Sequence, residues 1–95
     1  MREFLLRLYV AGDSISSRRA LEHVSLLRAN VLPENWDVEV IDVLAEPQLA
    51  EDAGILATPT LSYEHPAGSR RIVGDLSDAS RILSFLGIAA KDEKP

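Results

Sequence analysis

The stretch EFLLRLYV, at residues 3–10, decides the fold. In an extended conformation its apolar side chains occupy both faces, with Phe4, Leu6, Leu8 and Val10 on one and Leu5 and Tyr9 on the other. A strand that is apolar on both faces is typical of the centre of a sheet covered by helices. Residues 3–10 are therefore predicted to form the central strand, and the rest of the chain is interpreted around it.

A helix and a second strand follow this segment. Residues 16–32 carry an apolar stripe at three- and four-residue steps, made of Ala20, Leu21, Val24, Leu27 and Val31. Its N-cap candidates are Asp13, Ser14 and Ser16, and its end is expected at Pro33. Residues 36–43 (WDVEVIDV) alternate, with Trp36, Val38 and Val40 on one face and Asp37, Glu39 and Ile41 on the other. A helix between two such strands predicts a right-handed crossover with parallel strands.

The second half of the chain predicts a short helix, a hairpin and a last helix. The helix at residues 46–53 has Pro47 in its first turn and Gly54 after its end, and its expected inner face is Leu49, Ala50 and Ala53. Strands are expected at residues 61–64 and 70–73, joined by a loop at residues 65–69. Ser77 is expected to cap a helix that runs to residue 86 before Gly87, with Ile82, Leu83, Phe85 and Leu86 inside.

The resulting order, β-α-β-α-β-β-α, is that of an α/β, thioredoxin-like fold. We expect one domain over residues 1–88 and a short polar tail at residues 89–95. In this fold a cis-proline precedes the third strand, and Thr58-Pro59 stands at that position. We expect this peptide bond to be cis, the alternative being a trans-proline that starts an edge strand.

Composition and charge disfavour several classes of partner and location. The net charge of −5 disfavours binding to nucleic acid, and no apolar stretch approaches the ~20 residues of a membrane span. Charged Arg2, Glu3 and Arg7 make the first ten residues unlike a signal peptide, and the absence of cysteine fits a reducing compartment. We therefore expect a cytoplasmic protein with no nucleic-acid or membrane partner.

No catalytic, cofactor or metal site is expected. Residues 11–16 (AGDSIS) stand where redox members of the fold carry Cys-x-x-Cys, and serine supplies no thiolate. His23 and His65 lack companions at the spacing of a zinc site and are interpreted as surface residues. No serine elbow or facing carboxylate pair occurs. We expect a protein that is not an enzyme; the alternative is a thioredoxin-like enzyme with an unrecognised catalytic group.

Five segments together resemble the KaiB family of clock proteins. They are LYVAG at residues 8–12, VIDVL at 40–44, PQLAE at 47–51, ILATPTL at 55–61 and RRIVGDLSD at 70–78. The five segments stand in the same order and at the same spacing as in that family, so the resemblance covers about residues 4–80. The N-terminal sensor domain of the clock histidine kinase SasA is similar too, which leaves a detached kinase sensor domain as another alternative.

The resemblance implies a partner and a role. Members of the family bind KaiC, a hexameric ATPase, after which the complex sequesters KaiA and displaces the sensor kinase. This chain is therefore expected to dock onto a KaiC-type ATPase and to modulate a clock or stress-related output, with KaiA or a histidine kinase as further partners. The resemblance assigns partner binding to Arg19, with Asp13, Gln48 and Glu51 as further candidates.

The resemblance also implies a second fold. KaiB proteins switch between a resting, tetramer-forming fold and the thioredoxin-like form that binds KaiC, so the chain is expected to be metamorphic. The region expected to refold includes Gly74, Asp75, Leu76, Ser77, Phe85 and Gly87. After Asp78 the match fades, and residues 77–86 carry consistent helix signals, so we expect the thioredoxin-like form to dominate. The alternative is that the tetramer-forming fold dominates. The sequence leaves open whether the chain is a monomer, a dimer or a tetramer.

Overall fold

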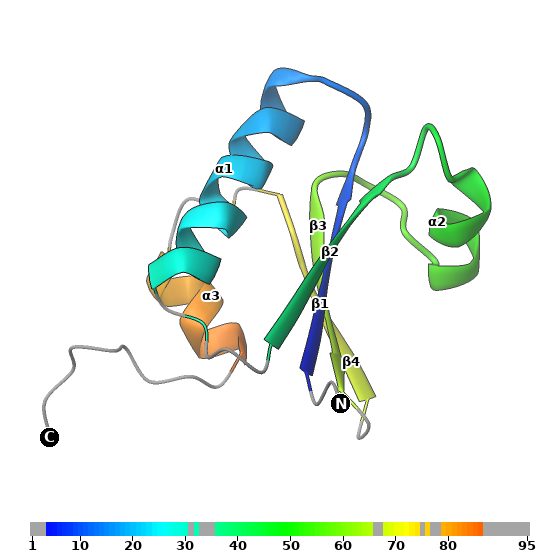
Figure 1. Ribbon diagram of the computed structural model, residues 1–95. Helices are drawn as coiled ribbons and strands as arrows, with labels where there is room; N and C mark the ends of the chain where they lie inside the picture. The colour runs from blue at the N-terminus through cyan, green and yellow to red at the C-terminus, as the bar shows by residue number, and fades with distance from the viewer. Residues whose placement is uncertain are drawn as a thin grey trace, which may run out of the picture.

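In the computed structural model, four strands form one mixed sheet with helices on both faces (Figure 1). The structure describes residues 4–30, 32, 36–65, 68–74, 76 and 79–86. Its elements, in chain order, are β1 (Phe4–Val10), α1 (Ile15–Asn30), β2 (Trp36–Asp42), α2 (Pro47–Ala53), β3 (Thr60–His65), β4 (Gly68–Val73) and α3 (Ala79–Leu86). This is the predicted order of elements.

The strand order is β2-β1-β3-β4, so β1 lies inside the sheet as its two apolar faces predict. β1 and β2 are parallel, in a register that runs from Phe4 opposite Trp36 to Val10 opposite Asp42. β3 is antiparallel to both β1 and β4. The ends of β1, β2 and β4 and the start of β3 therefore meet at one edge of the molecule. We call this edge the loop end; it comprises residues 11–14, 43–46, 54–59 and 74.

The main core lies between the sheet and the pair α1 and α3, which cover one face, while α2 lies on the other face (Figure 1). Leu6 and Leu8 of β1 are completely buried in this core. The helices contribute Ala20, Val24, Leu27 and Ile82, and the rest of the sheet and the chain after it contribute Val10, Trp36, Leu61, Ile72 and Leu76. On the opposite face Tyr9, Ile41 and Ala50 are buried. The apolar stripe predicted for α1 is thus confirmed for its described members.

One predicted interior position is wrong. Leu49 was expected on the inner face of α2 but is 44% exposed, because this short helix buries only Ala50 fully and half-buries Ala53. On the edge strand β2, Trp36 is buried, whereas Val40, predicted to lie on the same face, is 50% exposed.

Element boundaries differ from the predictions by two residues or fewer. α1 ends at Asn30 rather than residue 32, and the Leu32 N–H donates to the Leu27 carbonyl at 3.0 Å. β3 and β4 are longer than predicted, since His65 pairs with Gly68, which shortens the hairpin loop. The described part of α3 begins at Ala79 and ends at Leu86, the predicted last residue. Several expectations fall outside the described residues, namely those on Val31, Pro33, the cap Ser77, Gly87 and the tail at residues 89–95.

α2 is held at both ends by features that the sequence indicated. Pro47 occupies its first turn and Gly54 follows it with a left-handed φ of 71°. Arg71 of β4 adds a contact that was not predicted, because its guanidinium donates to the carbonyls of Gly54, at 3.2 Å, and Ala53. A cation at the carbonyl end of a helix is favourable, so Arg71 joins β4 to α2. Across the described ranges, no helix is long and apolar enough to cross a membrane.

Candidate functional site

Asp42, the last residue of β2, fastens two loops of the loop end to each other. Its Oδ1 accepts the N–H of Gly12 at 2.9 Å and the N–H of Leu44 at 3.0 Å. These main-chain donors, Gly12 first, lower the pKa of the Asp42 carboxyl. Gly12 has φ +62°, and a Cβ there would lie 3.0 Å from Cδ1 of Leu44, so the two loops are in close contact.

The serines at the start of α1 hold the loop that follows β1. Ser14 is the N-cap, because its Oγ accepts the Ser17 N–H at 3.2 Å. The Ser17 hydroxyl is buried; it accepts the Ala11 N–H at 3.1 Å and donates to the Ala11 carbonyl at 3.3 Å. The Ser14 hydroxyl donates to Ser17 Oγ at 2.9 Å. At the place where redox members of this fold carry cysteines, these two hydroxyls are engaged in local structure.

The Thr58–Pro59 peptide bond is cis, the geometry expected from the sequence. The Pro59 carbonyl accepts the N–H of Gly74 at 3.0 Å, so the chain before β3 is joined to the chain after β4. Gly74 has φ +98°, and a Cβ placed on it would meet no atom within 4 Å. The space beside Gly74 is therefore open.

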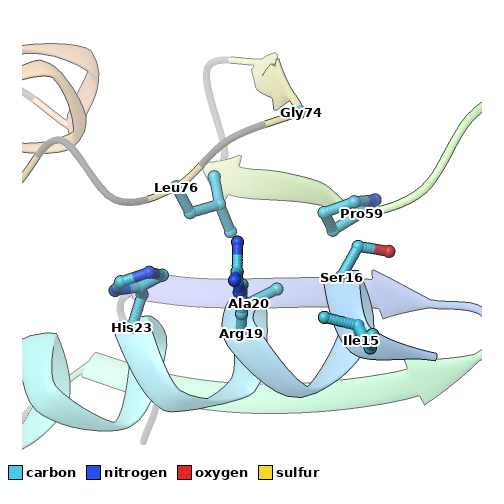
Figure 2. Close-up of a pocket in the computed structure, with 8 residues that line it drawn as sticks. All are labelled: Ile15, Ser16, Arg19, Ala20, His23, Pro59, Gly74 and Leu76. Atoms are coloured by element: carbon cyan, nitrogen blue, oxygen red, sulfur yellow. The ribbon is translucent and has the colours of Figure 1, made fainter. Parts of the chain in front are cut away.

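That open space belongs to a cavity of about 460 Å³ on the α1 side of the loop end. Figure 2 shows α1 along one wall, with Pro59, Gly74 and Leu76 on the facing wall. The residues contributed by α1 are Ile15, Ser16, Arg19, Ala20 and His23. His23, which was expected to be a surface residue, is half-buried and lines this cavity. The spacing of residues 16, 19, 20 and 23 was the available signal, since it places them on one helix face.

The partner-binding candidates divide into two groups rather than one cluster. Arg19 is exposed on α1, and the exposed Asp13 pairs with Arg18, whose Nε lies 2.9 Å from the Asp13 carboxylate. Gln48 and Glu51 are exposed on α2, where the Gln48 amide donates to Asp52 at 2.8 Å and to Glu51 at 3.4 Å. The first group thus lies on and just before α1 and the second on α2, and these two helices cover opposite faces of the sheet (Figure 1).

Sequence reasoning missed three apolar side chains of this region. Ile15 and Leu44 are each 71% exposed and Leu56 is 98% exposed. Ile15 is the first residue of α1, and Leu44 and Leu56 lie in the segments that connect β2 to α2 and α2 to β3. Hydropathy alone could not identify them, because apolar residues next to strands are usually buried.

The expected fold-switching residues are only partly described. Gly74 ends β4 with its left-handed φ, Leu76 is buried in the core, and Phe85 of α3 packs half-buried against it. Asp75, Ser77 and Gly87 lie outside the described residues. Among the side chains that the structure describes, no group of three His, Asp or Glu residues could hold a metal ion.

Comparison with known proteins identifies relatives over nearly the whole chain. Residues 7–88 match the KaiB domain. The circadian clock oscillator protein KaiB of Prochlorococcus marinus subsp. pastoris is 46% identical over 87 residues, which cover 92% of this chain and 81% of that protein. The protein of the same name from Parasynechococcus marenigrum is 48% identical over 87 residues, covering 92% and 84%.

Solved structures agree with this assignment. The N-terminal domain of Synechococcus elongatus SasA has a TM-score of 0.69 and 27% identity, covering 92% of this chain and 86% of that one. Mitochondrial thioredoxin 3 of Saccharomyces cerevisiae has a TM-score of 0.73 at 16% identity, covering 93% and 81%, and so shows the thioredoxin-like fold alone. With the KaiB domain matched over residues 7–88 and clock oscillator proteins nearly half identical to it, the chain belongs to the KaiB family of circadian clock proteins.

Proposed function

We propose that this chain is a non-enzymatic binding module whose loop end docks onto a KaiC-type hexameric ATPase and thereby modulates a clock or stress-related output. The observation that carries the proposal is the match to the KaiB domain over residues 7–88. KaiA or a histidine kinase would be further partners, reached through the ATPase complex.

The character of the loop end supports docking to a protein. Leu44 and Leu56 of the loop end, and Ile15 directly after it in sequence, expose apolar side chains, as protein-binding surfaces do. Arg19 adds a permanent planar cation that suits an acidic partner surface. Asp42 and the Pro59–Gly74 hydrogen bond hold the loops in place, which reduces the ordering cost of binding.

The chemistry of the same region supports a role other than catalysis. Thiol–disulfide exchange needs a thiolate, and the sequence contains no cysteine. The Ser14 and Ser17 hydroxyls are engaged with each other and with the Ala11 backbone. We therefore expect the purified protein to show no dithiol oxidoreductase turnover in an insulin-reduction assay.

A second candidate function follows from the likeness to the SasA N-terminal domain. The chain would then act as a detached sensor domain that occupies the same kind of ATPase without recruiting a KaiA-type protein. One observation distinguishes the two functions. A KaiB-type module in complex with the ATPase should bind a KaiA-type partner, whereas a detached sensor domain in the same complex should not.

Calorimetric titration of the KaiC-type hexamer from the same organism tests docking. Arg19→Glu is expected to weaken binding by about 1–3 kcal/mol if Arg19 is a central contact. Arg28→Glu is the matched control, because Arg28 is an exposed arginine in the last turn of α1, far along the helix from the loop end. Absence of binding by the unaltered chain would refute docking, and equal losses in both variants would remove Arg19 from the contact.

A further inference from the structure

The described lining of the cavity beside α1 differs in charge from the chain as a whole. The protein as a whole carries a net charge of −5. Among the described residues that line the cavity there is one permanent cation, Arg19, and no carboxylate. Within the described part of the molecule, no carboxylate pairs with the Arg19 guanidinium, whereas the neighbouring Arg18 is paired with Asp13. Arg19 is therefore available to an anion from outside.

The remaining lining is mostly apolar. Ile15, Ala20, Pro59 and Leu76 supply hydrocarbon surface, and Leu76 and Ala20 are almost completely buried behind it. Gly74 adds open space, since it has no side chain and no atom lies within 4 Å of its Cβ position. The volume of about 460 Å³ lies within the range of roughly 300–1,000 Å³ that is typical of small-molecule sites.

Polar groups at the cavity are few, and they are placed where they can orient a ligand. Figure 2 shows the Arg19 guanidinium extending from α1 toward the segment that carries Leu76. His23 lies one helical turn further along, and Ser16 lies one turn before it, near Pro59. Each of these two side chains can donate a hydrogen bond to an oxygen atom.

We propose that this cavity binds a small organic acid with an apolar body. Arg19 holds the carboxylate through its planar N–H fork, and the body packs against Ile15, Pro59 and Leu76. A cationic ligand is disfavoured by Arg19, and a bare inorganic anion would leave the apolar wall unused. Binding of such an acid needs only this chain and its ligand, so it can be tested without the ATPase, although Ile15 and Arg19 belong to both proposed surfaces.

The test is an amide NMR titration of the full chain with 3-phenylpropionate. Two probes define the chemistry: 3-phenylpropionamide keeps the body without the charge, and acetate keeps the charge without the body. We expect saturable shifts at amides of residues 15–23, 60 and 74 with 3-phenylpropionate, and binding at least tenfold weaker with either of the other probes. Equal shifts with acetate would mean that any small anion associates with Arg19, which would contradict a site that also recognises the apolar body.

Two variants distinguish binding in the cavity from a general effect of surface charge. Arg19→Gln is expected to weaken 3-phenylpropionate binding about tenfold to a hundredfold, as when a charge-assisted hydrogen bond is lost. Arg28→Gln, which removes the same charge from α1 away from the cavity, should leave binding unchanged. Should Arg19→Gln fold poorly, Arg19→Lys keeps the charge without the fork and is expected to bind with intermediate affinity.

Ser16→Phe adds an independent check, because Ser16 is an exposed residue at the cavity and a phenyl ring there would fill it. This variant should abolish the shifts while the amide spectrum keeps its dispersion. Unchanged affinity in both Arg19→Gln and Ser16→Phe, or equal weakening in Arg28→Gln, would overturn the proposal.

Discussion

Asp42 shows how one side chain organises the end of the molecule that carries the proposed function. Its carboxylate accepts two main-chain N–H groups from two different loops, those of Gly12 and Leu44. Both bonds are stronger to the ionised form, which is why the pKa of Asp42 is lowered in the folded chain. Folding and ionisation of this residue are therefore coupled.

This coupling predicts how the stability of the fold depends on pH. A carboxyl whose pKa is lower in the folded than in the unfolded chain stabilises the fold fully above its unfolded pKa of about 3.9. That contribution is lost as the pH falls through the lower, folded pKa. Asp42→Asn keeps an oxygen that can accept the same N–H groups but does not ionise.

Urea midpoints measured between pH 7 and pH 2 check this expectation. The unaltered chain should be more stable than Asp42→Asn at pH 7, and the gap should close in the acidic range. Asp52→Asn is the control, since Asp52 accepts its hydrogen bond from the side chain of Gln48. A gap between the unaltered chain and Asp42→Asn that stays constant down to pH 2 would contradict the coupling.

At the scale of elements, the start of α1 matters most, because it carries both Ile15 and Arg19, which line the cavity. A 16-residue helix whose first N–H groups are unsatisfied would fray at that end. Ser14 satisfies the Ser17 N–H, and the buried Ser17 hydroxyl ties the same turn to Ala11. The functional surface thus depends on a capped helix end.

Ser14→Ala is expected to destabilise the chain by about 1 kcal/mol, the usual cost of losing an N-cap. Ser25→Ala removes a hydroxyl from the exposed middle of α1 and should cost less than half as much. Chemical denaturation measures both, and amide exchange should accelerate in residues 15–18 of the first variant only. Equal stability of Ser14→Ala and Ser25→Ala would mean that the cap contributes nothing.

Elements could be predicted from the sequence because their signals are local. The two-faced apolar pattern of β1, the stripe of α1 and the Pro47 and Gly54 signals around α2 each depend on neighbouring residues. The exposure of a side chain was harder to predict, as Leu49 shows, because it depends on which surfaces another element covers. The cavity depends on residues far apart in the chain, such as His23 and Gly74, and no local pattern indicates that they meet.

At the scale of the whole molecule, the question is which fold dominates. α3 buries Ile82 and packs Phe85 against the core that β1 and α1 build. The region proposed to refold would have to give up these contacts, and two packings of one sequence need differ by only a few kcal/mol. We therefore propose that the chain can switch folds and that the thioredoxin-like form is the dominant one.

Amide NMR secondary shifts, together with sizing, test this proposal. Helical shifts throughout residues 79–86 in a monomer or dimer are expected. A β-strand at those residues in a tetramer would show that the resting fold of the family dominates instead. Ile82→Ala should shift the balance away from the thioredoxin-like form, because it deletes a buried side chain of α3.

Hydrogen exchange of the chain, with and without its KaiC-type hexamer, tests whether the protein docks through the loop end. Slower exchange on binding is expected in residues 11–19, 43–51 and 54–58, which lie at and beside the loop end. His65 and Gly68, which pair at the opposite end of the sheet, should exchange as in the free chain. Protection confined to that end of the sheet, with the loop end unchanged in a saturated complex, would contradict docking through the loop end.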